Sequence, residues 1–243
     1  MSTPPGIRLT GSAVIGGAPL FGPIDLDIPA GQWTCLLGVS GAGKTTVLRY
    51  LAGLETGATI DATVTLSDRK PLADRIAYMA QSDLLMPWLN VEENVLLGAR
   101  LRGAVDATAR DRARGLIALV GLAGDVAKRP KHLSGGMRQR VALARTLMED
   151  RPVILLDEPF SALDAKTRAE MQELAFGLLS ERTVLLVTHD PAEAARLGHK
   201  ITVLQNGALT ATKDPASDPI RAHDDPDVFS CQSELMNLIR EDA

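Results

Sequence analysis

The sequence predicts an α/β fold: parallel strands covered by helices, preceded by an antiparallel β region and interrupted by a helical insertion. Two short all-apolar runs, at residues 153–156 and 184–187, are flanked by helical patterns, which is typical of parallel strands buried on both faces. The N-terminal third instead has short strand-like runs separated by Gly and Pro. From residue 91 to 120 apolar residues recur every three or four positions, which indicates helices.

The first half of the chain supplies most of the predicted strands. The elements expected there are strands at 7–14, 24–28 and 33–37, a helix at about 44–54, and strands at 59–66 and 76–80. Strict alternation of apolar and polar residues at 24–28 indicates a half-exposed antiparallel sheet, whereas the apolar run at 33–37 indicates a buried strand. This region therefore combines an antiparallel sheet with the start of the parallel core.

The insertion is predicted to contain helices at 91–101 and 108–120. Between Arg100 and Lys131 the sequence has eight basic and three acidic residues, a balance of +5. Such a surface is either an ordinary solvated helix face or a face that lies near anionic lipid headgroups or an acidic partner. After the two buried runs we expect a strand at 201–204 and a closing helix at 232–239.

Composition excludes several classes of protein. The 243 residues are 45% hydrophobic and 23% charged, which is typical of a globular chain and not of a disordered one. The net charge is −4 and aromatic residues make up 3%, so a stacking platform for nucleic acid is disfavoured. Cys35 and Cys231 indicate neither a disulfide framework nor a metal cluster, which favours a reducing cytosol.

No segment has the length of a membrane-spanning helix. Residues 116–120 are among the longest strictly apolar runs, and a spanning helix needs about 20 residues. The first residues lack the basic start and apolar stretch of a secretory signal. We therefore expect a chain that does not cross a bilayer by itself.

A glycine-rich segment follows the buried strand at 33–37. Its residues are Gly38, Val39, Ser40, Gly41, Ala42, Gly43, Lys44 and Thr45, which fit the pattern G-x-x-x-x-G-K-[ST] between a strand and a helix. Glycines let backbone N–H groups wrap around phosphates, and the helix that follows presents its positive N-terminal end. Lys44 is expected to neutralise phosphate oxygens, and the Thr45 hydroxyl to ligate Mg²⁺. A plain Gly-rich turn would leave this Lys-Thr pair unexplained.

Two carboxylates end the apolar strand at 153–156. In a parallel sheet the carboxyl ends of strands face the ligand crevice, so Asp157 is placed to hold Mg²⁺. Glu158, one residue further on, is suited to orient and deprotonate a water aimed at a γ-phosphate. By itself this pair of acids is a weak signal, since such acids often only cap a helix. Together with the phosphate-binding segment it becomes a strong signal of catalysis.

A second helix start combines Ser134 with Gly135 and Gly136. Ser134 is a good N-cap, and a capped helix with a flexible entry is one interpretation. The glycine pair costs conformational entropy that a simple cap does not require. The chain then has two helix starts that favour an anion, whereas a nucleotide has only one triphosphate. Both helix starts can bind the same triphosphate if two copies of the chain face each other.

These motifs, in this order, resemble the ATP-binding subunit of an ABC transporter over nearly the whole chain. The resemblance matches 38–45 to Walker A, Gln81 to the Q-loop, 133–140 to the signature, 153–158 to Walker B, 161–164 to the D-loop and His189 to the switch histidine. It implies a P-loop NTPase core of RecA-like type with an N-terminal antiparallel β subdomain and an inserted α-helical subdomain. Residues 1–243 then form one ATP-binding domain, with the catalytic core and β subdomain at 1–81 and 150–243 and the helical subdomain at 82–149.

The resemblance also implies the roles of individual residues. ATP is held by residues 38–45 together with Thr46, and in trans by Ser134, Gly135, Gly136 and Asp164 of a facing subunit. Glu158, His189 and Gln81 are the implied catalytic residues, and Thr45, Gln81 and Asp157 the implied Mg²⁺ ligands. The partner is a second copy or a similar ATPase subunit.

Two positions depart from the family pattern. Met137 stands where the commonest signature has Gln; the Ser and the glycines are intact, so we expect activity to survive. The family usually stacks an aromatic ring on adenine, but the corresponding position falls near Val14 or Ile15. Either apolar contact binds the base, or Phe21 reaches it.

The segment at 83–95 resembles importers of nitrate, taurine, alkanesulfonates and the pyrimidine precursor of thiamine, and residues 98–103 favour the last. Such importers imply two membrane-spanning permease subunits, an extracytoplasmic binding protein and a peripheral place on the cytoplasmic face of the inner membrane. Trp88 is either a contact for the permease or ordinary packing.

Two other classes of protein remain as alternatives. A non-transport ABC ATPase acting on DNA or the ribosome would usually have long heptad insertions or two ATPase domains, and neither is present. A small-molecule kinase would not need Ser134, Gly135, Gly136 or His189.

Overall fold

The computed structural model describes residues 3–240, which form two compact units. The first unit contains residues 3–76, 152–157 and 179–240, and the second contains residues 77–151 and 158–178. Each unit is therefore assembled from segments that lie far apart in the sequence. The glycine-rich loop belongs to the first unit, and the helix that begins after Ser134 belongs to the second.

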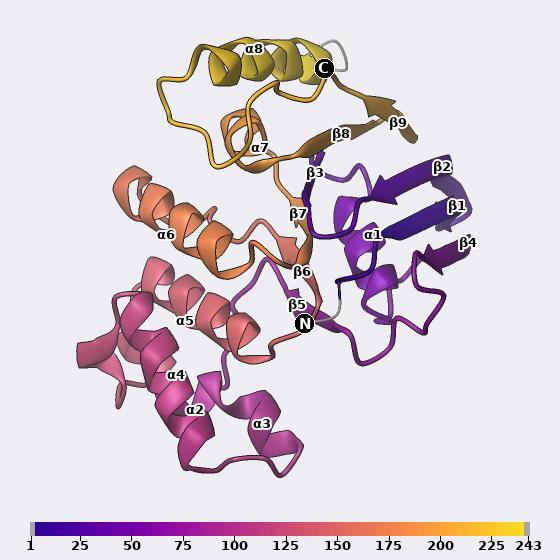
Figure 1. The fold of residues 1–243 in the computed structure, drawn as a ribbon. Helices are drawn as coiled ribbons and strands as arrows, with labels where there is room; N and C mark the ends of the chain where they lie inside the picture. The colour runs from indigo at the N-terminus through magenta and orange to yellow at the C-terminus, as the bar shows by residue number, and fades with distance from the viewer. Residues whose placement is uncertain (1–2, 241–243) are drawn as a thin grey trace. The chain divides into compact units, whose positions relative to one another are not determined.

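The first unit begins with an antiparallel sheet in the order β2-β1-β4 (Figure 1). Its strands are β1 (Ile7–Ile15), β2 (Ala18–Ile28) and β4 (Thr59–Leu66). Leu9 of β1 pairs with Leu26 of β2 on one side and with Val64 of β4 on the other. The predicted antiparallel region is confirmed. β2 starts earlier than the predicted residue 24, because Gly22 and Pro23 interrupt the alternating pattern without ending the strand.

The second sheet of the first unit contains the buried strands of the core. Its strands within this unit are, in spatial order, β6 (Val153–Asp157), β7 (Thr183–Val187), β3 (Trp33–Leu37), β8 (Lys200–Gln205) and β9 (Ala208–Ala211). The pairs formed by β6, β7, β3 and β8 are parallel, and β9 is antiparallel to β8. Every residue of β3, β6 and β7 is buried, which confirms the predicted α/β core.

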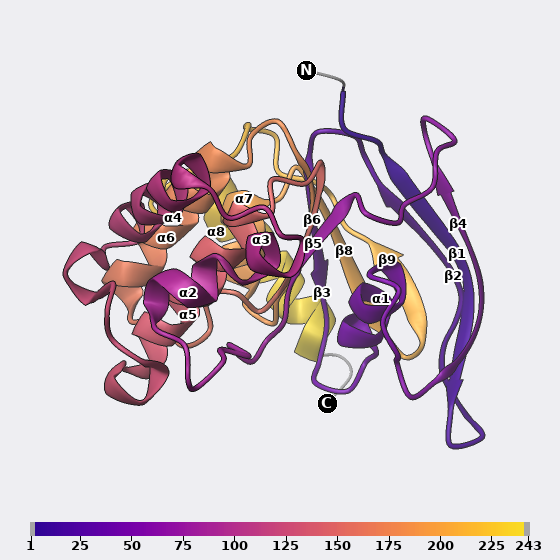
Figure 2. The ribbon, with the colours of Figure 1, turned by 90° about the horizontal axis from the view of Figure 1, so that it is seen from below.

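Helices cover both faces of this sheet. They are α1 (Lys44–Leu51), α7 (Pro191–Leu197) and α8 (Pro226–Arg240). Figure 2 shows α1 on one side of β3 and β8, and α7 and α8 on the other. α1 ends before the predicted residue 54, since Gly53 adopts a φ of +69° that ends the helical backbone. α8 begins well before the predicted residue 232, because Val228, Cys231 and Leu235 form one buried stripe.

The second unit is mostly helical. Its elements are α2 (Val91–Val95), α3 (Leu97–Leu101), α4 (Ala107–Leu119), the 3₁₀ turns η1 (Ala123–Asp125) and η2 (Pro130–His132), α5 (Gly135–Met148) and α6 (Ala165–Leu178); β5 (Ile76–Met79) begins at the boundary of the two units. The predicted helix at 91–101 is two helices, because Leu96 has a ψ of −1° where they meet. No helix among residues 3–240 is long and apolar enough to cross a membrane.

Candidate active site

The glycine-rich loop connects β3 to α1, and its glycines adopt backbone conformations that other residues rarely adopt. Gly38 has a φ of +154°, and a Cβ there would lie 2.3 Å from the carbonyl oxygen of Leu204. Gly43 has a φ of +101° and directly precedes α1, where a Cβ would lie 2.9 Å from Cδ1 of Phe21. These glycines let the loop curl tightly at the N-terminus of a helix, which is the geometry of an anion-binding turn.

Lys44 lies across this loop. Its side chain is buried, and Nζ donates hydrogen bonds to the carbonyl oxygens of Gly38 at 2.7 Å and Val39 at 2.8 Å. A buried ammonium group needs such partners because losing water is costly for a charge. The loop therefore holds a fixed positive charge where phosphate oxygens would bind.

Thr45 and Asp157 meet at the end of β6. The Thr45 hydroxyl donates a hydrogen bond of 3.2 Å to Oδ1 of Asp157. The Asp157 residue is 1% exposed. A hydroxyl and a carboxylate oxygen at this spacing are the hard oxygen ligands that Mg²⁺ prefers. The residues present therefore fit a magnesium ion beside the phosphate loop.

Gln81 and Glu158 meet within the second unit. Nε2 of Gln81 donates a hydrogen bond of 3.0 Å to Oε2 of Glu158. Glu158 has a φ of +47°, a backbone region that non-glycine residues rarely adopt. Its carbonyl oxygen accepts hydrogen bonds from Gln139 Nε2 at 3.3 Å and Ser161 Oγ at 3.0 Å. A strained backbone conformation of this kind persists only where surrounding groups hold it in place, and such conformations are common at functional sites.

The glycine pair of the second unit opens α5. Ser134 Oγ accepts a hydrogen bond of 3.2 Å from the Met137 N–H, so Ser134 is the N-cap expected from the sequence. A Cβ on Gly136 would lie 3.3 Å from Cδ2 of Leu163 and 3.4 Å from the carbonyl oxygen of Ala162. Gly136 therefore lets the start of α5 approach the segment that leads into α6.

Asp164 caps α6. Its Oδ1 accepts a hydrogen bond of 3.0 Å from the Thr167 N–H. The hydrogen bonds from the Thr167 backbone and side chain lower the pKa of the Asp164 carboxyl. Asp164 is exposed and keeps its negative charge at neutral pH.

His189 belongs to the first unit, in the short connection between β7 and α7. The residues on either side of it are hydrogen bonded: the Asp190 N–H donates to Oγ1 of Thr188 at 3.0 Å. Asp190 also caps α7 by accepting a hydrogen bond of 2.9 Å from the Ala192 N–H. The segment between β7 and α7 is thus fixed by hydrogen bonds at Thr188 and Asp190. His189, which lies between these two residues, is exposed.

Phe21 is not available to stack on a nucleobase, and this hypothesis is corrected. Phe21 is 2% exposed, and its ring packs beside Gly43, as the close approach of Cδ1 shows. Val14 and Ile15 are 38% and 46% exposed. Contact of the base with apolar side chains stays a prediction.

The sequence did not identify Gln139, whose buried side chain holds the backbone of Glu158. Gln139 falls on the α5 face that also carries buried Ala142 and Thr146, and a polar residue on such a face is the signal that could have found it. The sequence also did not identify Arg138 and Arg145, which bind the segment after Gln81.

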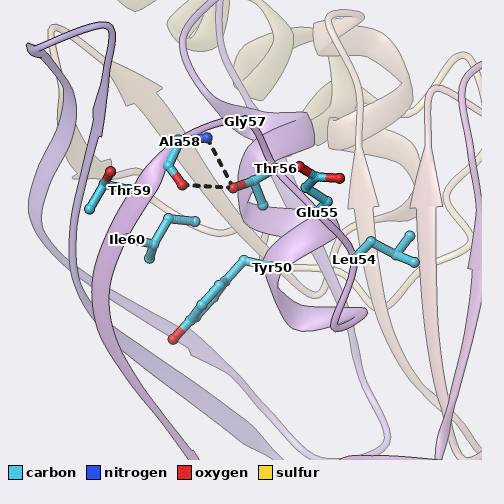
Figure 3. Close-up of a pocket in the computed structure, with 8 residues that line it drawn as sticks. All are labelled: Tyr50, Leu54, Glu55, Thr56, Gly57, Ala58, Thr59 and Ile60. Carbon is cyan, nitrogen blue, oxygen red and sulfur yellow. Dashed lines mark hydrogen bonds between the residues drawn. The ribbon is translucent and has the colours of Figure 1, made fainter.

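An open hollow of roughly 570 Å³ lies elsewhere in the first unit, between the end of α1 and the start of β4. Figure 3 shows Thr56 among the residues that line it; its Oγ1 accepts a hydrogen bond from the Ala58 N–H and donates one to the Ala58 carbonyl oxygen. Tyr50 lines the hollow and donates its hydroxyl to the Ala62 carbonyl oxygen at 2.9 Å. No residue that we predicted to bind ATP or Mg²⁺ lines it.

The fold and the glycine-rich loop define a P-loop ATPase. Residues 21–161, more than half of the chain, match the profile of the ABC transporter family. An ABC transporter ATP-binding protein of Haemophilus influenzae is 42% identical over 230 residues, covering 93% of this chain and 94% of that protein. The chain therefore belongs to the ABC transporter family and is its ATP-binding, ATP-hydrolysing subunit.

Further relatives have named import functions. The aliphatic sulfonates import ATP-binding protein SsuB of Escherichia coli K12 is 44% identical over 188 residues, covering 76% of this chain and 71% of that protein. The thiamine import ATP-binding protein ThiQ of Mesorhizobium japonicum is 41% identical over 202 residues, covering 81% and 79%.

Solved ABC cassettes share the fold. A dimeric bacterial ABC transporter cassette matches with a TM-score of 0.73 and 30% identity, covering 89% of this chain and 99% of that one. The same cassette in a post-hydrolysis state with ADP and phosphate matches with a TM-score of 0.73 and 29% identity.

Proposed function

We propose that this chain powers an ABC importer for a small organic or anionic nutrient. The observation that supports this most directly is the phosphate loop, in which Lys44 is held over the Gly38 and Val39 carbonyls and Thr45 bonds Asp157. The similarity to SsuB and ThiQ supports import as the direction of transport. The free energy of ATP hydrolysis then drives the transport cycle.

ATP binds with its phosphates on the glycine-rich loop. The residues assigned to this role are Gly38, Val39, Ser40, Gly41, Ala42, Gly43, Lys44, Thr45 and Thr46. Backbone N–H groups and Lys44 neutralise the phosphate oxygens. Thr45, Asp157 and Gln81 would hold Mg²⁺, which when bound neutralises charge that develops on the phosphate oxygens.

Glu158 is the proposed general base. Its carboxylate takes the proton of the water that attacks the γ-phosphorus, and the bond from that phosphorus to the bridging oxygen breaks, so that ADP and phosphate are formed. Gln81, already hydrogen bonded to the Glu158 carboxylate, orients the water. His189 contacts the γ-phosphate. The strained backbone of Glu158 supports this assignment, because such strain is imposed by neighbours that also aim the side chain.

The functional unit is a dimer, formed with a second copy or a similar ATPase subunit. Ser134, Gly135, Gly136 and Asp164 of one subunit act on the nucleotide held by the other. The similar solved cassette is dimeric, which supports this arrangement. The exposed Ser134 and Gly135 at the start of α5 leave that helix end available to a facing subunit.

The dimer docks on two membrane-spanning permease subunits at the cytoplasmic face of the inner membrane. The contact lies near Trp88, whose 65% exposure leaves most of the residue accessible. A large exposed ring is a typical anchor of an interface. An extracytoplasmic binding protein delivers the nutrient to the permease, and nucleic acid has no part in the cycle.

The transported nutrient is a pyrimidine precursor of thiamine, or else an alkanesulfonate, taurine or nitrate. The decisive experiment deletes the gene for this chain in its own cell and measures uptake of each labelled compound. Restoring the gene should restore uptake of one compound, and Lys44→Ala should not. Undiminished uptake of all four in the deletion strain would contradict the proposed substrates. DNA-stimulated ATP hydrolysis with no effect on uptake would instead favour the non-transport class.

A further inference from the structure

The segment after Gln81 forms an exposed apolar surface on the second unit, which we call the Leu84–Trp88 surface. Leu84 is 58% exposed and Trp88 is 65% exposed. Leu84 has a φ of +46°, which costs free energy for a residue with a branched side chain. An exposed segment keeps such a backbone only when other groups hold it in place.

Asn94 of α2 holds one end of this surface. It is fully buried, and Nδ2 donates hydrogen bonds to the carbonyl oxygens of Met86, Leu89 and Asn90 at 3.3, 3.2 and 2.9 Å. Its Oδ1 accepts a hydrogen bond of 2.8 Å from the Met86 N–H. Both the nitrogen and the oxygen of the Asn94 side-chain amide are therefore hydrogen bonded. These bonds fix the backbone on the α2 side of the surface.

Two arginines of α5 hold the other end. Arg145 donates from Nη2 to the carbonyl oxygen of Asp83 at 2.6 Å and from Nη1 to that of Leu84 at 2.9 Å. Arg138 donates from Nε to Oδ2 of Asp83 at 2.9 Å, and from Nη1 to the Leu133 carbonyl oxygen at 2.9 Å. The strained Leu84 is thus bonded directly to the helix that starts after Ser134.

The chemistry of Arg145 suits this role. Burial lowers the pKa of Arg145, because removing the charged guanidinium from water costs free energy. The planar fork contacts two successive carbonyl oxygens at once, whereas a lysine ammonium is a single point charge on a flexible stem. A lysine at this position would keep the charge and lose the paired contact.

We propose that Arg138 and Arg145 are positioning residues that tie the Leu84–Trp88 surface to α5, so that the surface and the Ser134–Gly136 helix start move together. This inference rests on the proposed function, in which ATP engages Ser134, Gly135 and Gly136. ATP that restrains the start of α5 then changes the surroundings of Trp88 through Arg145, Asp83 and Leu84. A partner bound at the surface acts on the helix start by the same connection.

Acrylamide quenching of tryptophan fluorescence tests the connection. The chain has two tryptophans, and Trp33 is 1% exposed, so the quenched emission comes mainly from Trp88. A Trp88→Phe variant measures what Trp33 contributes. The assay uses the full chain with Glu158→Gln, so that added ATP and Mg²⁺ remain intact, and labelled ATP in equilibrium dialysis measures binding separately. ATP should change the quenching of Trp88.

Arg145→Lys should abolish this ATP-dependent change while ATP still binds. Arg112→Lys is the matched control, since Arg112 also donates to a carbonyl of α5, that of Leu147 at 3.2 Å, but has no bond to Asp83 or Leu84. The control should keep the full change. If thermal unfolding shows that Arg145→Lys is not folded, Asp83→Ala replaces it, with the same expected loss.

The outcomes separate the two proposals. A parent chain that does not bind ATP would overturn the proposed function and with it this inference. ATP binding with no change in Trp88 quenching, or a change that survives in Arg145→Lys, would overturn the connection and leave the proposed function intact.

Discussion

Gln81 Nε2 lies 3.0 Å from Oε2 of Glu158, so the amide that follows β5 already contacts the carboxylate that follows β6. The Glu158 carbonyl is meanwhile held by Gln139 of α5. The side chain and the backbone of Glu158 are therefore each fixed by a different element of the second unit. A carboxylate held in this way has a restricted set of orientations, which favours a role in aiming a water molecule.

Glu158→Gln should reduce ATP turnover by about 10²- to 10⁴-fold, because loss of a general base typically costs that much. ATP binding should persist, since the phosphate loop is unchanged, and ATP should hold the chain as a dimer. Phosphate release and size-exclusion chromatography with ATP measure the two effects. Glu170→Gln, at an exposed position of α6, is the control and should keep parent turnover. A Glu158→Gln variant with parent turnover would show that another group is the base.

Lys44→Ala should weaken ATP binding by about tenfold to a hundredfold, because a hydrogen bond to a charged group contributes roughly 1.5–3 kcal/mol. Isothermal titration with ATP measures the dissociation constant, and thermal unfolding confirms that the variant is folded. Lys166→Ala removes a lysine that is 87% exposed on α6 and should leave the affinity unchanged. Equal affinities for Lys44→Ala and the parent would remove Lys44 from the phosphate site.

Thr45→Val should reduce the gain in ATP affinity that Mg²⁺ provides. Valine keeps the shape of threonine but removes the hydroxyl that bonds Asp157 and would ligate the ion. ATP affinity is compared with Mg²⁺ and with a chelator. Thr45→Ser restores a hydroxyl and should restore most of the Mg²⁺ effect. The metal role is refuted by a Thr45→Val variant whose affinity rises with Mg²⁺ as much as that of the parent.

Gly43→Ala should destabilise the chain by about 1–3 kcal/mol, because its backbone conformation is strained for any other residue. The φ is +101°, and the new Cβ would press on the buried Phe21 ring at 2.9 Å. Urea unfolding measures the change. Gly177→Ala is a useful comparison, since a Cβ there meets nothing within 4 Å and α6 should gain up to about 1 kcal/mol. Similar effects of both substitutions would contradict this account.

The fold and the location of the chemical groups could be predicted from short-range patterns. The run at 153–156 predicts a buried strand, and the position of Asp157 at its carboxyl end follows from the geometry of parallel sheets. The glycine spacing likewise predicts a phosphate loop before α1. Both predictions depend on residues close in sequence, so a local sequence pattern is enough to make them.

Tertiary packing could not be predicted in the same way. Whether Phe21 faces a ligand or Gly43 depends on how β2 lies against the loop, and no local pattern encodes that contact. The bonds from Arg145 to Asp83 and Leu84 join residues about 60 positions apart and use backbone carbonyls, which every residue has. The types of residue at positions 83 and 84 therefore do not indicate that their carbonyl oxygens accept hydrogen bonds from Arg145.

The stability of the first unit should fall as the pH drops through the titration of His199. The Trp33 N–H donates a hydrogen bond of 3.0 Å to Nδ1 of His199, which requires that nitrogen to be unprotonated. Burial, and then the positive charge of Arg221, lowers the pKa of His199 below its ordinary value of about 6.5. Below about pH 6.5 the unfolded chain binds more protons than the folded chain, so acid favours unfolding.

Thermal unfolding at about pH 7.5 and about pH 5.5 measures this effect, since the ordinary pKa of histidine lies between them. His199→Asn places an amide oxygen near the position of Nδ1 and keeps an acceptor for the Trp33 N–H without titrating. The unfolding temperature of the parent should fall more than that of His199→Asn between the two pH values. Parallel decreases would mean that His199 does not carry the pH dependence, because only the parent has an imidazole at this position.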